Sequence, residues 1–320
     1  MKPRVFVTRR IPAAGLNHVL AACEADVWPG DMPPPYDELC RRVRGIDGLL
    51  CLLTDRVDAN LMDAAGPQLK VISQMAVGYD NIDLAAARAR GIAVGNTPGV
   101  LTEATADLTV ALLLAAARRL FEAAAYIREG RWQTWEPMVL LGADLSGAAL
   151  GIVGLGRIGR AVARRAAGFN LRVIACSPGL SPAEAAEAGA ELVNLDTLLR
   201  ESDFVSLHVP LNDSTRHLIN RERLALMKPS AILINTARGS VVDQEALVDA
   251  LRRGVIAGAA LDVTDPEPLP ADHPLLALPN AIVVPHIGSA SRHTRDRMAQ
   301  MAADNLLAGV RGVPLPNAVT

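Results

Sequence analysis

Three side chains that could transfer a proton or bind an anion follow apolar, strand-like runs in the second half of the chain. Arg238 ends the run ILINTARGS, Glu267 lies between two prolines in LDVTDPEPLP, and His286 ends AIVVPH. The carboxyl ends of parallel strands form the ligand crevice of an open α/β sheet, so we expect the three side chains to meet there. Taken singly, a loop Arg or Glu is more often solvated, and a His after a strand is more often a satisfied capping group.

Together these groups could reduce a carbonyl compound if a hydride donor is bound beside them. Free histidine titrates near neutrality, so His286 could protonate a carbonyl oxygen as hydride arrives. Glu267 on the other ring nitrogen would fix the tautomer and favour the imidazolium. Arg238 could bind a substrate carboxylate with its planar fork and polarise the carbonyl. The small residues at 288–290 would leave room for both reactants.

A glycine-rich turn after the apolar run ALGIV is the expected site of the hydride donor. A GxGxxG pattern lies between this run and an amphipathic helix, and it consists of Gly154, Leu155, Gly156, Arg157, Ile158 and Gly159. The glycines permit a tight turn and close approach of the backbone to a pyrophosphate, while the helix N-terminus offers N–H groups to the phosphates. An ordinary glycine-rich βα turn is the alternative, and the strand–turn–helix context favours a dinucleotide.

The position that usually selects the dinucleotide carries no acid. An Asp or Glu ~20 residues after the glycines normally holds the ribose 2′-hydroxyl. Here Ser177 and Pro178 occupy this position, and the next acid, Glu184, lies within the following helical segment. Without a carboxylate to repel it, a 2′-phosphate could be accepted, with Ser177 and Arg157 as donors. The sequence therefore favours NADP(H), and NAD(H) is the alternative.

Composition excludes several classes of protein. The net charge of -2 indicates neither a nucleic-acid partner nor an anionic membrane. The most apolar segment, Leu108 to Ala117, is too short to span a bilayer, and the N-terminus does not resemble a signal peptide. The four cysteines have neither the spacing of a metal site nor that of a secreted disulfide framework. We therefore expect a cytoplasmic protein with reduced thiols and no metal site.

Strand-like and helical segments alternate along most of the chain, which predicts parallel βα units. The first hundred residues contain the strand-like runs RVFVTRR, GLLCLL, LKVISQMA and GIAVGNT, and the alternation restarts at Ala149. One long helix is expected over 102–129, followed by an irregular segment with two tryptophans, and a last helix over 291–308. For 320 residues, about two domains are expected.

We predict two doubly wound parallel-sheet α/β domains, one inserted into the other. The helix at 102–129 would carry the chain out of the first domain, and the last helix would carry it back. The expected boundaries give a substrate domain of residues 1–101 and 287–320 and a dinucleotide-binding domain of residues 102–286.

These motifs and their order resemble the D-isomer-specific 2-hydroxyacid dehydrogenases, and within that family the glyoxylate/hydroxypyruvate reductases. The resemblance covers nearly the whole chain and rests on VGYDNID, NTPGVLTEATADLTVALLL, GIVGLGRIG, NTARGSVVDQEAL, LDVTDPEPLPADHPLL and PHIGSAS. It implies a Rossmann-type cofactor domain inserted into a flavodoxin-like substrate domain. It also implies NAD(P)H-dependent reduction of a small 2-keto acid, glyoxylate and/or hydroxypyruvate, to the D-2-hydroxy acid.

The resemblance further implies roles for individual residues. Arg238, Glu267 and His286 match the catalytic set of the family. The backbone N–H groups of Val77 and Gly78 would hold the substrate carboxylate, and Leu53 would help to wall the pocket. The matching positions that line the cofactor are Thr105, Thr236, Ala237, Asp262 and Gly288.

Departures from the family pattern and two alternatives bear on these expectations. Close relatives can carry Arg just after the second strand, where this chain has SPGLSP, and Glu267 argues against the formate-oxidising branch, which has Gln. Family members resemble one another as homodimers, so Trp135 in RWQTWEP would approach the active site of a partner. The alternatives are a corepressor-type protein that senses NAD(H), or a dehydrogenase of another 2-hydroxy acid such as 3-phosphoglycerate.

Overall fold

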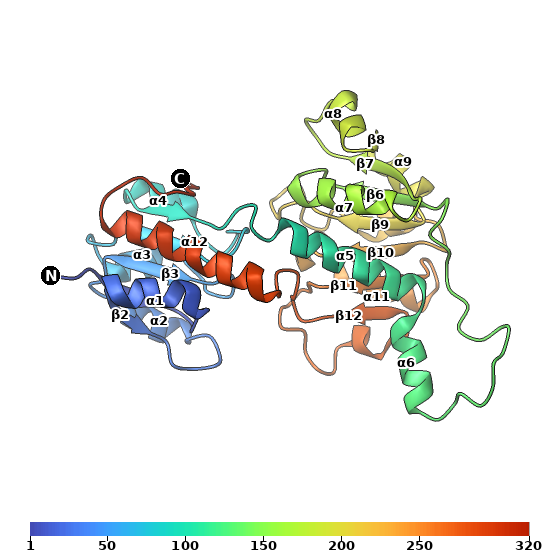
Figure 1. Ribbon diagram of the computed structural model, residues 1–320, viewed down its shortest axis with the longest axis horizontal. Helices are drawn as coiled ribbons and strands as arrows, with labels where there is room; N and C mark the ends of the chain where they lie inside the picture. Colours follow the sequence, from blue (N-terminus) through green and yellow to red (C-terminus); the bar gives the residue numbers. More distant parts are fainter. Residues whose placement is uncertain (320) are drawn as a thin grey trace. The chain divides into compact units, whose positions relative to one another are not determined.

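The computed structural model describes residues 1–319 and divides into two compact units (Figure 1). Unit 1 comprises Met1–Leu101 and the chain from Ala290 onward, and unit 2 comprises Thr102–Ser289. Unit 2 is therefore inserted into the sequence of unit 1. The chain leaves unit 2 after residue 289 rather than after 286, because the N–H groups of Ile287 and Gly288 both donate to the Asp262 carboxylate within unit 2.

Unit 1 is built on a five-stranded sheet in the order β2-β1-β3-β4-β5. All pairs of neighbouring strands are parallel. The elements of unit 1 are β1 (Arg4–Val7), α1 (Ala13–Ala22), β2 (Glu24–Val27), α2 (Tyr36–Arg42), β3 (Gly48–Cys51), α3 (Ala59–Ala65), β4 (Val71–Gln74), α4 (Leu84–Ala89), β5 (Ala93–Gly95) and α12 (Arg292–Val310). This strand order is the flavodoxin-like one, as the sequence predicted.

Both faces of the unit 1 sheet are covered, and the residues of β1 show how. Phe6 packs in one core cluster with Leu39, Leu61 and Met62 of helices α2 and α3. Val5 and Val7, on the opposite face, belong to a second cluster that includes side chains of α1 and α12. Since successive strand residues point to opposite faces, a continuous apolar strand indicates a sheet buried on both sides.

Unit 2 contains a seven-stranded sheet in the order β12-β11-β10-β9-β6-β7-β8, parallel throughout. Its elements are α5 (Thr102–Ala117), α6 (Leu120–Arg128), β6 (Ala149–Val153), α7 (Arg157–Ala167), β7 (Arg172–Cys176), α8 (Pro182–Glu187), β8 (Glu191–Leu192), α9 (Leu195–Glu201), β9 (Phe204–Leu207), α10 (Arg221–Leu224), β10 (Ile232–Asn235), the 3₁₀ turn η1 (Gly239–Val241), α11 (Gln244–Arg252), β11 (Gly258–Leu261), the 3₁₀ turn η2 (Pro274–Ala277) and β12 (Ala281–Val283). The order is the Rossmann order with one further strand, β12, at its edge.

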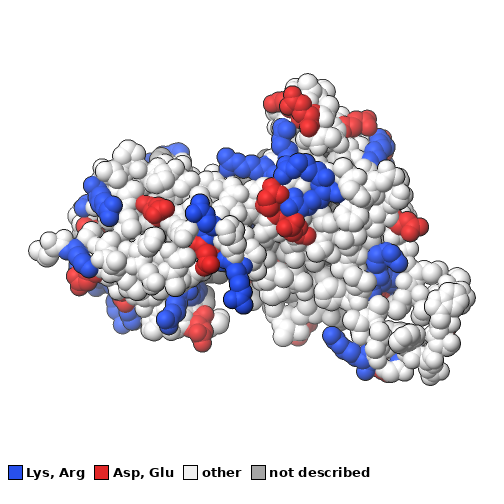
Figure 2. Space-filling model, in the orientation of Figure 1, with Lys and Arg blue, Asp and Glu red and all other residues white. Residues whose placement is uncertain are grey.

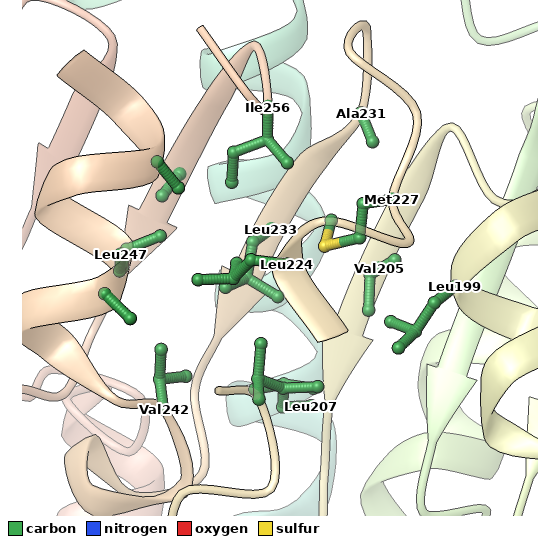
Figure 3. Close-up of a cluster of buried hydrophobic side chains, with 14 of the residues drawn as sticks. Leu199, Val205, Leu207, Leu224, Met227, Ala231, Leu233, Val242, Leu247 and Ile256 are labelled. Atoms are coloured by element: carbon green, nitrogen blue, oxygen red, sulfur yellow. The ribbon is translucent and has the colours of Figure 1, made fainter. Parts of the chain in front are cut away.

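Two apolar clusters hold the layers of unit 2 together. One joins the sheet to α5 and α7, and the other joins it to α9, α10 and α11. Figure 3 shows part of the second cluster, in which Val205, Leu207 and Leu233 of the strands lie among side chains such as Leu199 and Leu247 of the helices. This packing fixes the strands, and the carboxyl ends of the strands carry the loops considered below.

The single helix expected over 102–129 is instead two helices, α5 and α6. Arg119, between them, has a left-handed backbone with φ 51°. The break has a tertiary cause, because the N–H of Ala143 donates to the carbonyl of Ala117 at 2.8 Å and so takes the place of the next helical turn. Gly142 permits this close approach, since a Cβ there would lie 2.2 Å from the same carbonyl oxygen.

The surface carries charges of both signs. On the face shown in Figure 2, acidic and basic side chains lie side by side over α5 and α7, where Arg164 and Arg165 form ion pairs with Glu103 and Asp107. The segment after α6 is mostly uncharged in the same view. Among the described residues, no helix is both long enough and apolar enough to cross a membrane.

Candidate active site

The candidate residues of unit 2 all lie beyond the carboxyl ends of its strands. The glycine-rich turn follows β6, Arg238 follows β10, Glu267 lies beyond β11, and His286 follows β12. The strand order reverses between β6 and β9, and in doubly wound sheets ligands bind at such a switch point, outside the carboxyl ends of the strands.

The glycine-rich turn is shaped by close backbone contacts on one side and open space on the other. Gly154 has φ 96°, and a Cβ there would lie 2.8 Å from the carbonyl oxygen of His208. A Cβ on Gly159 would lie 2.2 Å from the carbonyl oxygen of Gly154, so the helix packs directly on the turn. Gly156, by contrast, faces open space and caps α7 without any side-chain hydrogen bond. The first N–H groups of α7 are therefore available to an anionic ligand.

The segment after β7 contains no carboxylate directed at a ribose. Ser177 and Pro178 follow the strand, and Ser177 is half-buried. The Glu184 carboxylate instead accepts hydrogen bonds from the Ser181 N–H at 2.9 Å and from its hydroxyl at 2.8 Å, in a capping box at the start of α8. These bonds, the backbone one foremost, lower the pKa of Glu184. The Glu184 carboxylate is therefore engaged in capping its own helix.

His286 and Glu267 form a hydrogen-bonded pair. The Nδ1 atom of His286 contacts Oε1 of Glu267. The two side chains are 24% and 33% exposed, so the pair is largely shielded from water but still accessible to a ligand. Because Nδ1 is engaged, Nε2 is the ring nitrogen left to face a reacting group, and within residues 1–319 it has no hydrogen-bond partner.

Asp262, at the end of β11, holds the loop that carries His286. Its backbone carbonyl accepts the N–H of His286 at 2.9 Å. Its carboxylate accepts the N–H of Ile287 at 2.6 Å and that of Gly288 at 2.8 Å. The side chain is buried, and burial is the main cause of its raised pKa, which the nearby His286 partly opposes. His286 itself adopts a left-handed backbone with φ 51°.

Arg238 lies on a turn that the side chain of Asn235 shapes. Asn235 donates from Nδ2 to the carbonyl of Arg238 at 2.9 Å and accepts the N–H of Ala237 at 3.0 Å. The half-buried guanidinium of Arg238 donates to the carbonyl of Ala237 at 2.8 Å. The turn packs closely on the loop after β11, because a Cβ on Gly239 would lie 2.0 Å from the carbonyl oxygen of Thr264.

Comparison with known proteins assigns this arrangement to a family. Residues 110–288, more than half of the chain, match the family model described as the D-isomer specific 2-hydroxyacid dehydrogenase, NAD binding domain. The chain belongs to this dehydrogenase family. It is accordingly an NAD(P)-dependent 2-hydroxyacid dehydrogenase, and the glycine-rich turn lies in its NAD-binding domain.

The similarity to known proteins extends over nearly the whole chain. The chain is 54% identical to glyoxylate reductase of Korarchaeum cryptofilum, over 100% of this chain and 96% of the relative. The crystal structure of a protein from Thermus thermophilus is 54% identical with a TM-score of 0.93, covering 99% of this chain and 100% of that one. An NADPH-dependent glyoxylate/hydroxypyruvate reductase from Sinorhizobium meliloti, solved in complex with NADP and malonate, is 34% identical with a TM-score of 0.86, covering 100% of this chain and 97% of that one.

Three threonines of the dehydrogenase tie α5 to the loops of the site. Thr105 donates from its hydroxyl to the carbonyl of Gly288 at 3.2 Å. Thr109 bonds the carbonyl of Thr105 at 2.8 Å and the hydroxyl of Thr236 at 2.9 Å. The sequence singled out Thr105, Thr236 and Gly288 but not Thr109, which lies one helical turn after Thr105 on the same face of α5.

The predicted substrate contacts of the dehydrogenase lie in unit 1. Leu53 follows β3, and Val77 and Gly78 follow β4, its neighbour in the sheet. Asn81 ties the two loops together, because its side-chain amide donates to the carbonyls of Leu52 and Asp55 at 3.1 and 2.8 Å. Leu53 is 37% exposed, which leaves its side chain available to a ligand.

His208 is a residue of the switch point that the sequence did not single out. It follows β9 beside the glycine-rich turn, and its Nε2 contacts the Ser206 hydroxyl at 2.8 Å. Desolvation lowers the pKa of His208 to about 4, so the ring is neutral at pH 7. The available signal was its position in SLHVP, where a histidine follows an apolar strand just as His286 does.

Proposed function

We propose that the protein reduces glyoxylate and/or hydroxypyruvate to the corresponding D-2-hydroxy acid with NAD(P)H. The observation that carries the proposal is the His286–Glu267 pair, which lies at the same sheet edge as the glycine-rich turn. The identity to glyoxylate reductase over the full length supports the choice of substrate.

The residues of the glycine-rich turn fit a dinucleotide. Gly156 leaves open space beside the uncapped start of α7, which suits a pyrophosphate. Thr105, Thr236, Ala237, Asp262 and Gly288 would border the nicotinamide end. When bound, the nicotinamide supplies a hydride to the substrate carbon.

Proton transfer falls to His286. Glu267 holds Nδ1, so a proton on Nε2 would face the carbonyl oxygen of the substrate and neutralise the alkoxide as it forms. The carboxylate of Glu267 stabilises the imidazolium before the transfer. Arg238 would pair with the substrate carboxylate and polarise the carbonyl. The N–H groups of Val77 and Gly78 would bind the carboxylate, with Leu53 at the wall of the pocket.

NADP(H) is the favoured cofactor in this proposal. Ser177 follows β7 where an acid would repel a 2′-phosphate, and the Glu184 carboxylate is committed to Ser181. Arg157, exposed at the first position of α7, is the available cation. The relative from Sinorhizobium meliloti is described as NADPH-dependent, which agrees with this preference.

We also propose that two copies of the chain associate, in the cytoplasm. None of the residues of α6 is buried within the chain. The exposed large apolar side chains of α6 and the segment after it are Leu120, Phe121, Ile127, Trp132, Trp135, Met138 and Leu141. Such a cluster on a single chain is typical of an interface, and Trp135 would then approach the site of the partner.

Purified protein tests the activity directly. NADPH or NADH oxidation is followed with glyoxylate and with hydroxypyruvate, and the wild type is compared with His286→Ala. Loss of a general acid lowers kcat by ~10²–10⁴-fold while cofactor affinity stays largely unchanged. A wild type that binds NADPH but turns over neither keto acid would refute the proposed substrate class, and near wild-type turnover by the variant would refute the role of His286.

A further inference from the structure

Two successive peptide groups in the loop after β4 turn their carbonyls toward the same neighbouring segment. The Ala76 carbonyl accepts the backbone N–H of Thr97 at 2.9 Å. The Val77 carbonyl accepts the side-chain amide of Asn96, from Nδ2, at 2.8 Å. In a planar trans peptide the C=O and the following N–H point in opposite directions. The N–H groups of Val77 and Gly78 therefore both point away from the segment at 96–97.

These two N–H groups have no partner among residues 1–319, although Val77 and Gly78 are both half-buried. Backbone N–H groups that are shielded from water are nearly always paired, so an unpaired adjacent couple indicates a place for a ligand. Successive N–H groups on one side of a turn form an anion-binding concavity. A carboxylate, with two acceptor oxygens, matches a pair of donors.

The peptide between Val77 and Gly78 needs a hydrogen bond from outside the loop to keep this orientation. Rotating the peptide plane changes ψ of Val77 and φ of Gly78, and glycine accepts positive and negative φ about equally. Steric repulsion alone therefore does not prevent the carbonyl from turning into the concavity. The hydrogen bond from Asn96 does, because the turned carbonyl would lose it.

Asn96 is itself held firmly. It is 8% exposed. Its backbone carbonyl accepts Nδ2 of Asn305 in α12 at 2.8 Å, and its backbone N–H donates to the carbonyl of Asn317 at 3.2 Å. The fully buried Asn305 also accepts the N–H of Asn317 at 3.0 Å. These bonds use the backbone of Asn96, so its side-chain amide is left for Val77.

We propose that Asn96 is a positioning residue for the substrate carboxylate, whose binding to Val77 and Gly78 it secures by fixing the orientation of the peptide between them. The inference rests on the proposed function, in which the substrate is a 2-keto acid. It assigns to Asn96 a role in substrate affinity without any contact with substrate, cofactor or reacting atoms.

The test compares Asn96→Ala with the wild type and with Asn280→Ala. The alanine at 96 removes only the side-chain amide and retains the backbone bonds to Asn305 and Asn317. Asn280 is the matched control, since its amide, like that of Asn96, donates to the backbone, here to the carbonyls of Leu251 and Ala257 in unit 2. Thermal unfolding establishes that each variant is folded, and the near-isosteric Asn96→Asp replaces Asn96→Ala if the latter is not.

Two constants report substrate binding in each protein, the KM for glyoxylate and the Ki of oxalate, a competitor that carries carboxylates but no reducible carbonyl. The KM for NADPH is measured as a third constant. Hydrogen bonds to a charged group are strong enough that misdirecting one should raise the first two constants roughly ten- to a hundredfold. The KM for NADPH should stay within about twofold, since a purely local loss of substrate binding leaves cofactor affinity alone. Asn280→Ala should leave all three unchanged.

The outcomes separate this inference from the proposed activity. A folded Asn96 variant with unchanged KM and Ki, or one in which the KM for NADPH rises as much, overturns the positioning role. Isotope-labelled valine and glycine report the amide resonances of Val77 and Gly78 independently of turnover. Oxalate should shift them in the wild type and less in the variant, even if the wild type reduces no keto acid. Equal shifts in both proteins would contradict the inference.

Discussion

Asp262→Asn probes the carboxylate that fixes the loop of His286. The substitution keeps the shape of the side chain but leaves a single acceptor oxygen where two backbone N–H groups now bind, those of Ile287 and Gly288 at 2.6 and 2.8 Å. One of these N–H groups must then face the amide NH₂. We expect the loop to shift and His286, the proposed proton donor, to lose its alignment.

The magnitude follows from these contacts. A hydrogen bond to a charged acceptor contributes about 1.5–3 kcal/mol, and a neutral one about 1 kcal/mol. The variant loses one charged bond and weakens the other, for a loss of about 2–5 kcal/mol. Burial raises the pKa of Asp262, so the carboxylate already carries a desolvation cost that asparagine avoids. The net loss is then about 2 kcal/mol. If all of it raises the activation free energy of the step that uses His286, kcat falls roughly thirtyfold.

The assay is steady-state reduction of glyoxylate by NADPH, with urea unfolding at several pH values. The matched control is Asp249→Asn, at an exposed carboxylate of α11 that binds Arg221 and Arg253. Because the pKa of Asp262 is raised in the folded state, the folded protein holds this proton more tightly. Its contribution to stability is therefore full at low pH and is lost as pH rises from the ordinary value of 3.8 through the folded pKa.

Asp262→Asn should lack this pH-dependent loss, so the stability difference from wild type should be larger on the acid side of that window. A variant with wild-type kcat would show that the carboxylate does not align His286. A stability difference that grows with pH would show that the pKa is lowered rather than raised.

Three further outcomes are expected. Arg238→Lys should lower kcat/KM for glyoxylate by roughly a hundredfold, since an ammonium cannot reproduce the guanidinium fork; an unchanged value would make Arg238 a structural residue. Ser177→Asp should shift the ratio of kcat/KM for NADPH and NADH toward NADH by roughly ten- to a hundredfold, and an unchanged ratio would place the ribose elsewhere. Phe121→Glu, on the exposed face of α6, should weaken self-association in sedimentation experiments, and an unaltered oligomer would move the interface to another surface.

The sequence pointed to those parts of the candidate site that depend on local pattern. A GxGxxG motif between a strand and a helix is defined by residues that are adjacent in the sequence. The turn at Gly154–Gly159 could therefore be recognised from the sequence alone. Arg238, Glu267 and His286 could be named as candidates because each lies beyond an apolar run, and parallel strands bring their carboxyl ends to the same side of a sheet. The two parallel sheets followed from the same alternation.

The hydrogen bonds that hold the loops of the site in place were not predictable in this way. Asn96 and Val77 are 19 positions apart, and Asp262 and Gly288 are 26 apart, so no local pattern marks these bonds between a side chain and the backbone. The break between α5 and α6 was missed for a similar reason. Nothing in the helical stretch itself requires a stop near Arg119, because the stop is imposed by a segment that returns later.

His286 has a left-handed backbone, so keeping a histidine at this position for proton transfer lowers the stability of the fold. For a residue with a Cβ, this conformation costs about 1–2 kcal/mol, which glycine would not incur. A screen that selects this protein for heat resistance alone should therefore enrich glycine at position 286 and yield more stable variants that lack the proposed proton donor. Directed evolution toward thermostability would have to include turnover in each round to retain the imidazole.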